Sequence, residues 1–253
     1  MARKKGGGGG RQRARQRQQY DELDKYPVMP PHAFARIVRD KQTLNIIYQI
    51  IEPPLTKKEQ EQRDEIMDIF IRSLTANIEE IDSNPEAYVR TAMDKVIKSY
   101  SMKINKKSKS KLFYYLRRDL IGYGKMDVLM NDVNVEDISL DGTNVPIFAY
   151  HRKFESVETT CVWETDEELE SYVIKLAQRC GKHISVAEPL LDATLMDGSR
   201  IVMKLGHEIS TRGSAFCIRR FKDDPFSPAD IVAFRTMSSL MVAYLWILSL
   251  IHI

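Results

Sequence analysis

Apolar side chains recur at helical spacing through much of the first half of the chain. Over residues 57–81 the apolar positions trace one face of a helix, and Thr56 with Glu59 forms a capping box at its start. Asn84 before Pro85 predicts a second helix. After the lysine and serine cluster at 105–110, the segment KLFYYLRRDLIGYG predicts a third helix, closed by glycines. We therefore expect residues 31–121 to form a helical N-terminal region, in which the type of segment 33–51 stays open.

From about Val135 the pattern changes from helical spacing to alternation of apolar and polar positions. The segments VEDISL, VPIFAYH and SVETTCVW predict strands. A helix over DEELESYVIKLAQRCG follows, capped by Thr165 with Glu168 and ended by Gly181, and then come the strand-like segments SRIVMKL and TRGSAFCIRRF. Residues 122–222 are therefore predicted to form an α+β domain with a small antiparallel sheet and packed helices.

Residues 223–253 have a different character. Ser227 followed by Pro228 predicts the start of one helix, and a second, apolar helix is predicted from about Ser239. Two short apolar helices without a partner are typical of the beginning of another domain.

Charge separates the first residues from the rest of the chain. The net charge is +3, but the first twenty residues carry seven Lys or Arg and no acid, so the remainder is 3 − 7 = −4. Five successive glycines and the run RQRARQRQQ cannot bury apolar surface, and we expect residues 1–30 to be a disordered basic tail. Its role stays open between a tether to anionic lipid or nucleic acid and a solubilising extension.

Several classes of chemistry find no support in the sequence. The three cysteines are widely separated, and no GxxxxGK[ST], HExxH, GxSxG or EF-hand pattern occurs. The histidines lie in separate segments, so we expect no metal site. No secretory signal is present, and the apolar stretch from Met241 to the end is too short to span a bilayer. These features predict a cytoplasmic protein.

Arginines beside small polar residues are the strongest chemical signal. The guanidinium fork suits phosphate oxygens, and a strand holds it in place. For any one of these arginines the alternative is a solvated side chain or a surface ion pair. Asp192 and Asp197, around the sequence TLMDG, are predicted to form the turn, and Arg117 and Arg118 either a solvated helix face or a partner contact. The candidate phosphate-binding arginines are Arg200, Arg212, Arg219 and Arg220.

The order of sequence blocks resembles a known family. The runs LIGYGKMDVLMNDVNVEDISLDG, VPIFAYHRKF, LAQRCGKHISVAEPLLDATLMDGSRI, EISTRGSAFCIRRFKDDPFSP and TMSSLMVAYLW resemble the archaeal branch of the secretion superfamily ATPases, which power type II and type IV secretion, type IV pili and the archaellum. The resemblance covers roughly residues 112–247, with a weaker echo in YQIIEPPLT.

The resemblance implies a PAS-like N-terminal domain over residues 122–222, joined to a RecA-like domain that begins within 223–253. It implies ATP and Mg²⁺ as cofactors of the complete protein, a homo-hexamer, and a polytopic inner-membrane platform protein as partner at the cytoplasmic face of the membrane. Specific nucleic-acid binding is not implied. Arg200 and Arg219 match the arginines that reach the nucleotide phosphates and act in hydrolysis, while Arg212 and Arg220 are weaker matches that would help to bind the nucleotide.

The sequence also departs from the family pattern. Met196 stands where the family has proline, and Ala215 and Cys217 replace small hydroxyl residues. The family's Walker A loop would follow residue 247, where the closing LSLIHI resembles translated adapter sequence. We therefore expect a fragment truncated before Walker A, which lacks the Mg²⁺ ligands and does not hydrolyse ATP by itself.

Two other function classes stay open. One is a non-enzymatic PAS-like scaffold or partner-binding module. The other is a nucleic-acid-binding protein that depends on the basic tail, whose binding would fall steeply with salt.

Overall fold

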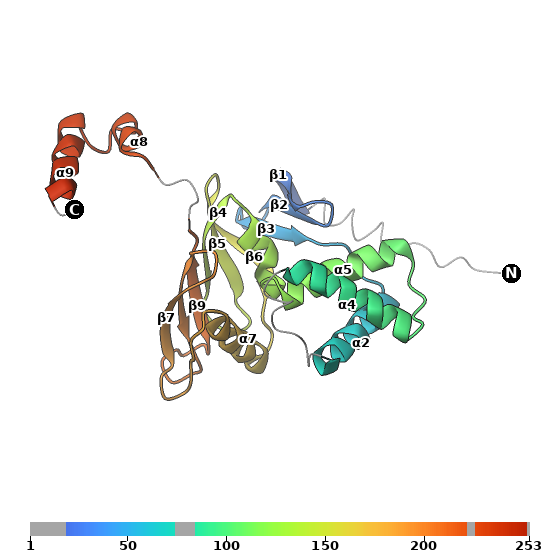
Figure 1. Ribbon diagram of the computed structural model, residues 1–253. Coiled ribbons are helices and arrows are strands. Elements are labelled where there is room, and N and C mark those ends of the chain that lie inside the picture. The colour runs from blue at the N-terminus through green and yellow to red at the C-terminus, as the bar shows by residue number, and fades with distance from the viewer. Residues whose placement is uncertain (1–18, 74–83, 222–225, 252–253) are drawn as a thin grey trace. The chain divides into compact units, whose positions relative to one another are not determined.

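A computed structural model of the chain describes residues 19–73, 84–221 and 226–251 (Figure 1). The chain divides into two compact units, Met1–Arg220 and Phe221–Ile253. The basic tail predicted at the N-terminus falls largely outside the described residues.

The described part of unit 1 contains a nine-stranded sheet in the order β1-β2-β3-β6-β5-β4-β9-β8-β7. All neighbouring strands are antiparallel except β3 and β6, which run parallel. With helices packed on this mixed sheet, the fold is α+β, as the sequence predicts. The strands are β1 Tyr20–Met29, β2 Ala33–Asp40, β3 Ile46–Ile51, β4 Val135–Leu140, β5 Pro146–His151, β6 Glu155–Val162, β7 Leu190–Thr194, β8 Arg200–Lys204 and β9 Ala215–Arg219.

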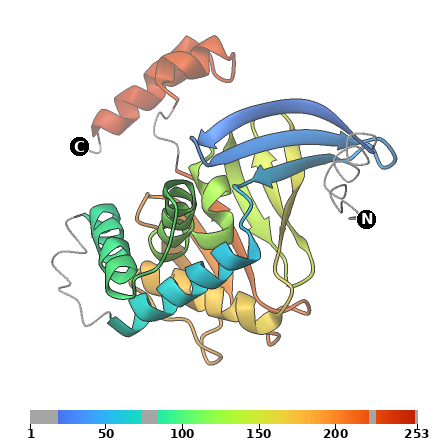
Figure 2. The same ribbon diagram turned by 90° about the vertical axis from the view of Figure 1, so that its right-hand side faces the viewer.

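The first three strands correct the prediction for the N-terminal region. Disorder through residue 30 is wrong for Tyr20–Met29, and the segment 33–51 within the predicted helical region holds β2 and β3. The sheet edge formed by β1 accommodates Pro27, because an edge strand needs no donor on its outer side. In β2, Ala33, Ala35 and Ile37 are fully buried, although two small residues give only a weak hydrophobic signal. Figure 2 shows β1–β3 continuing the curve of the other strands.

Three helices form a group of their own in unit 1: α2 Lys57–Ser73, α4 Pro85–Ser99 and α5 Lys106–Leu120 (Figure 1). The predicted caps are confirmed, since Thr56 and Glu59 bond each other reciprocally and the Asn84 side chain accepts from the Ala87 amide. Helix α5 begins five residues earlier than predicted, because Asn105 caps it through the Ser108 amide. The predicted end of the first helix, residues 74–81, lies outside the described residues.

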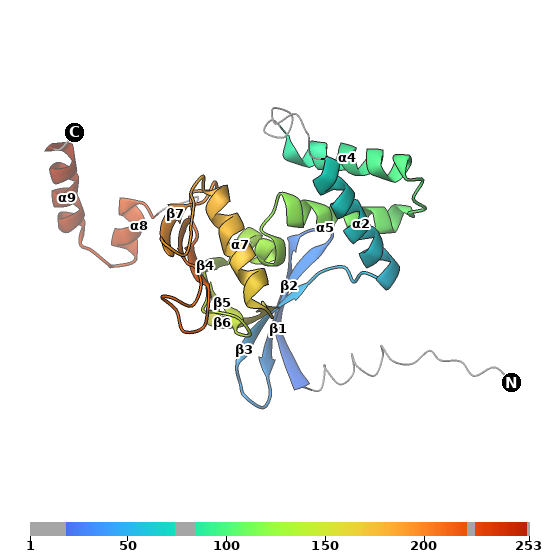
Figure 3. The ribbon, with the colours of Figure 1, turned by 90° about the horizontal axis from the view of Figure 1, so that it is seen from below.

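The main core lies between the sheet and the short helices η1 Gly124–Met126 and α6 Asp127–Asn131 together with α7 Asp166–Arg179. Figure 3 shows α7 alongside the strands. At the start of α7 the Thr165 cap is confirmed by the bond from the Glu168 amide, whereas the Glu168 carboxylate pairs with Lys125. Trp163 is 1% exposed at the centre of this core, which extends from β2 and β3 to β8 and β9. The N-terminal strands therefore share one core with the rest of unit 1.

Unit 2 contains α8 Pro228–Ala233 and α9 Ser239–Ile251. The predicted cap at Ser227 is confirmed, and the structure adds a reciprocal bond from Asp230 that completes a capping box at the start of α8. In α9 nine large apolar side chains are each at least 38% exposed: Leu240, Met241, Tyr244, Leu245, Trp246, Ile247, Leu248, Leu250 and Ile251. None of the described helices is long and apolar enough to cross a membrane.

Candidate anion-binding site

Arg200 and Arg219 lie side by side on the exposed face of the sheet. Their Cα positions are direct partners in the antiparallel register of β8 and β9. On β8 the apolar Ile201 and Met203 are buried, which turns Arg200 to the opposite, exposed face. On β9 the burial of Ile218 turns Arg219 to the same face. The structure thus brings together the two arginines that the sequence favours most.

The two side chains are strongly exposed, Arg200 by 72% and Arg219 by 81%. Side chains directly opposite each other in an antiparallel pair have Cβ atoms about 5 Å apart, so two like charges here repel each other. Two guanidinium groups at this spacing provide many donors, all pointing away from the core. Such a pair can bind an anion with several oxygens, for example a phosphate group.

Each arginine pairs with an aspartate on the strand outside it. The Arg200 Nη2 atom lies 3.0 Å from Oδ2 of Asp192 on β7. The Arg219 Nε atom lies 3.2 Å from Oδ1 of Asp137 on β4. Across the neighbouring strands β7, β8, β9 and β4 the side chains therefore carry one negative, two positive and one negative charge, from Asp192, Arg200, Arg219 and Asp137. We name this group of four side chains the charge row.

The two aspartates flanking the turn TLMDG behave differently from each other. Asp197 accepts hydrogen bonds from the amide and hydroxyl of Ser199, which confirms its predicted role in the turn. Asp192 does not form the turn, because it lies within β7 opposite Val202 and its carboxylate bonds Arg200. The sequence did not predict β7 as a strand, since LLDAT has no clear alternation.

Arg212 lies at the other end of β9 from Arg219. The intervening strand, Ala215–Arg219, extends about 13 Å at the usual rise per residue. The Arg212 backbone packs against Gly142, where a Cβ atom would meet the Arg212 carbonyl oxygen at 2.1 Å. The structure therefore does not bring Arg212 to the charge row.

Arg220 is half-buried and turned toward the backbone. Its Nη1 atom donates to the carbonyl oxygens of Asp132 and Val135, and its amide donates to Glu136. These groups belong to the loop between α6 and β4 and to the start of β4. Arg220 thus ties the end of β9 to that loop, at the boundary of unit 1.

Arg118 takes neither of the roles open to it from the sequence. Its Nη1 atom lies 2.7 Å from Oε2 of Glu52 at the end of β3, and its guanidinium stacks on the Tyr115 ring. The Arg118 side chain is only 11% exposed. The pair joins α5 to the sheet.

Sequence reasoning missed a buried polar group around Asp132. Tyr26 and Tyr48 each donate a hydrogen bond of 2.6 Å to Asp132 Oδ2, and the Asn134 amide donates to Oδ1. Burial raises the pKa of both tyrosines, with Asp132 adding to the shift. No local sequence pattern predicts this group, because its members come from β1, β3 and the loop after α6.

His151 of β5 completes the group around Asp132. Its Nδ1 atom accepts from the Lys153 amide, so Nε2 carries the proton and donates to the Tyr26 oxygen at 3.0 Å. Burial lowers the pKa of His151, which favours this neutral form. Every one of these contacts is made within the fold, and the group is best understood as structural.

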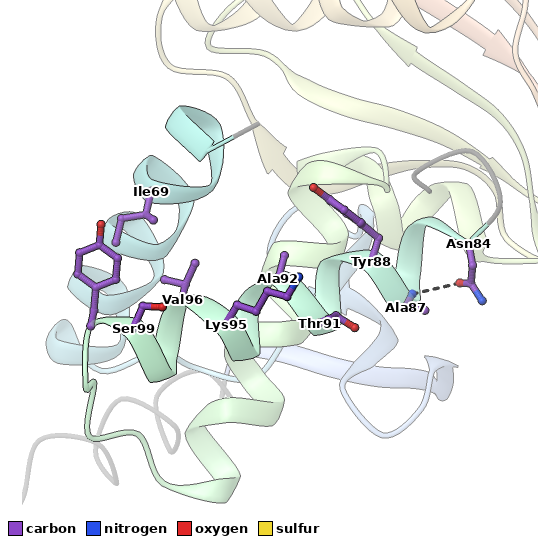
Figure 4. A pocket seen from close by; sticks show the side chains of 10 residues that line it. Ile69, Asn84, Ala87, Tyr88, Thr91, Ala92, Lys95, Val96 and Ser99 are labelled. Carbon is purple, nitrogen blue, oxygen red and sulfur yellow. Dashed lines mark hydrogen bonds between the residues drawn. The ribbon is translucent and has the colours of Figure 1, made fainter. Parts of the chain in front are cut away.

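A hollow of about 730 Å³ lies between α2 and α4 (Figure 4). Ile69 of α2 and Tyr88, Ala92 and Val96 of α4 line it, with Lys95 as its cation. The residues that line it include no carboxylate, imidazole or thiol.

Metal-binding side chains do not gather in the part of the chain that the structure describes. Within residues 19–73, 84–221 and 226–251, no three His, Cys, Asp or Glu side chains lie close enough to hold a metal ion. The described residues alone therefore do not form a carboxylate cluster for Mg²⁺.

Comparison with curated proteins finds relatives in one archaeon. The uncharacterized protein MJ1288 of Methanocaldococcus jannaschii is 42% identical over 164 residues, which cover 64% of this chain and 65% of that protein. The uncharacterized protein MJ0900 of the same organism is 31% identical over 227 residues, or 88% of this chain and 40% of that protein. This chain thus spans less than two thirds of the length of either relative.

No family model matches the chain. Among solved structures, the VirB11 ATPase from the Brucella suis type IV secretion system, in complex with sulphate, aligns with a TM-score of 0.37 and 17% identity. The alignment covers 45% of this chain and 34% of that chain. A likeness this weak supports no conclusion about fold or function.

Proposed function

We propose that this chain is the N-terminal portion of a hexameric ATPase of the secretion superfamily, which powers type II or type IV secretion or the assembly of a pilus or archaellum. Its role is to supply Arg200 and Arg219 to the phosphates of ATP. The observation that carries the proposal is the adjacency of these two arginines on the exposed sheet face. The ordered sequence blocks that resemble this family add independent support.

In this role the arginines act by electrostatics. Negative charge on the transferring phosphoryl group is stabilised by guanidinium groups, and the strands hold both side chains in register. Bound ATP and Mg²⁺ would supply the reacting phosphate and the neutralising metal. The described residues fit the phosphates through the two arginines, but they offer no Mg²⁺ cluster. In this proposal the phosphate loop is supplied by other sequence, because no GxxxxGK[ST] pattern occurs in the 253 residues, and the chain by itself should not hydrolyse ATP.

The remaining parts of the proposal follow from the family resemblance. Further copies of the chain would form the hexamer, and a polytopic membrane protein would be the partner at the cytoplasmic face of the membrane. The helices α2, α4 and α5, which have a core of their own, are the proposed docking region for that partner. Arg212 and Arg220 stay weaker candidates for nucleotide contact.

The first test of this function reads the source DNA beyond codon 253. A GxxxxGK[ST] loop within about twenty codons of Trp246 supports the ATPase. A stop codon there, without such a loop, favours the non-enzymatic scaffold instead.

The second test measures steady-state ATP hydrolysis by the protein that this longer frame encodes. Arg200→Ala or Arg219→Ala should lower kcat by at least about 10-fold while changing nucleotide affinity less than about 3-fold. Lys204→Ala, on the same exposed face of β8, removes a positive charge as a matched control. Unchanged rates in both arginine variants would remove these residues from the mechanism.

A further inference from the structure

We propose that Asp137 and Asp192 act as internal competitors of phosphate, which hold Arg219 and Arg200 apart until an anion displaces them. This inference rests on the proposed function, because it concerns the same two arginines. It assigns a regulatory role to side chains that the family resemblance did not single out.

The geometry of the charge row carries the inference. Both aspartates lie outside the arginine pair, on β7 and β4, so each carboxylate draws its guanidinium away from the other arginine. Asp137 is the direct cross-strand partner of Arg219, whereas Asp192 reaches Arg200 diagonally from its position opposite Val202. In each pair a carboxylate oxygen accepts from an N–H group, at Nη2 of Arg200 or Nε of Arg219, that a bound phosphate would otherwise use.

The strengths of the two interactions favour replacement of each aspartate by phosphate over a permanent aspartate–arginine ion pair. Asp192 is 56% exposed and Asp137 37% exposed, and ion pairs this open to water contribute little to stability. A phosphate group with several charged oxygens can bridge both guanidinium groups at once, whereas each aspartate reaches only one of them. Exchange also relieves the repulsion between the arginines, because the bridging anion lies between them.

Two consequences distinguish a competitor from a structural partner. Removing either carboxylate should strengthen anion binding, since it removes the competing group and a nearby negative charge. A purely structural role predicts the opposite, because the arginine would lose the partner that orders it. The sign of the change therefore decides between them.

The experiment titrates the chain 1–253 with inorganic triphosphate at low salt and follows the arginine Nε–H signals by NMR. Asp137→Asn and Asp192→Asn should each tighten binding about 3- to 10-fold, the size expected for removing one charge close to a solvent-exposed site. Asp137→Glu, which keeps the charge, should restore wild-type affinity. Asp64→Asn on α2 changes the net charge equally, and its carboxylate pairs with Arg63, away from the charge row. It should leave binding unchanged.

Each outcome points to a different conclusion. Binding that depends on Arg200 and Arg219 but weakens or stays the same in both asparagine variants overturns this inference and leaves the proposed function standing. Binding that is absent in the wild type, or unaffected by Arg219→Ala, overturns this inference, whereas the proposed function is decided separately by the kcat of the Arg200→Ala and Arg219→Ala variants of the longer protein. An equal gain with Asp64→Asn assigns the effect to net charge and also overturns the inference.

Discussion

The Tyr48 hydroxyl donates a hydrogen bond of 2.6 Å to Oδ2 of Asp132 across 84 residues of sequence. Both side chains are buried, Tyr48 completely and Asp132 to 1% exposure. The bond joins β3 to the loop between α6 and β4. The Arg220 guanidinium donates a hydrogen bond to the backbone carbonyl oxygen of the same Asp132. One buried residue thus connects the N-terminal strands with the boundary of unit 1.

Tyr48→Phe should lower the free energy of unfolding of unit 1 by about 1–2 kcal/mol. The substitution keeps the ring but removes one donor to a buried carboxylate, which retains the Tyr26 hydroxyl as partner. Urea unfolding followed by Trp163 fluorescence measures the change, in a Trp246→Phe background because Trp246 is exposed on α9. Tyr150→Phe, at a 44% exposed position, is the matched control. Equal effects of the two variants would show that the bond to Asp132 contributes nothing measurable.

Glu59 makes the stability of the helical group depend on pH. A hydrogen bond from Ser108, followed by bonds from Thr56, lowers the pKa of this carboxyl from 4.5 to about 2. The carboxylate therefore stabilises the fold fully above pH 4.5, and this contribution is lost as the pH falls from 4.5 through about 2.

The test compares wild type with Glu59→Gln by urea unfolding, monitored by circular dichroism, between pH 7 and pH 2.5. The stability difference between them should be largest at pH 7 and shrink below pH 4.5. Glu65→Gln on the same helix is the control for loss of an exposed carboxylate. A difference that stays constant over the whole range would contradict the lowered pKa.

The sequence predicted those features that depend on neighbouring residues. The caps at Thr56, Asn84, Thr165 and Ser227 were readable because the side chain and the amide it bonds are three residues apart. The same holds for β8 and β9, where alternation placed both arginines on strands. That the two arginines lie opposite each other depends on the register between β8 and β9, which the alternation within each strand does not determine.

Features that depend on distant residues were missed. In β2 two of the buried core positions are alanines, whose small side chains give a weak hydrophobic pattern. Strand β1 contains a proline, which a sheet accommodates at its edge. Pairing of Asp137 with Arg219 joins residues 82 apart, and Glu52 with Arg118 joins residues 66 apart. Such pairs require the folded sheet, so the charge row could not be read from the sequence.

Gly142→Ala should destabilise unit 1 by more than about 3 kcal/mol. The residue has φ of +113°, and an added Cβ would lie 2.1 Å from the Arg212 carbonyl oxygen, so strain and a clash add together. Gly206→Ala is the matched control, because it also has positive φ, +74°, but its Cβ would meet nothing within 4 Å. It should cost only about 1 kcal/mol. Thermal unfolding of the two variants measures the difference between their losses of stability. Equal losses would show that the turn before β5 moves away from Arg212 without a cost in free energy.

Arg219 and Arg220 are adjacent in sequence but should differ in what their loss changes. Arg220→Ala removes a donor shared by the carbonyl oxygens of Asp132 and Val135, and should lower the free energy of unfolding by about 1–3 kcal/mol. Arg219→Ala removes an exposed ion pair and should change stability by less than about 1 kcal/mol. Triphosphate binding should show the reverse order, with a large loss in Arg219→Ala and a small one in Arg220→Ala. Urea unfolding and the NMR titration together measure both properties. Arg220→Ala that leaves stability unchanged but abolishes binding would instead place Arg220 in the anion site.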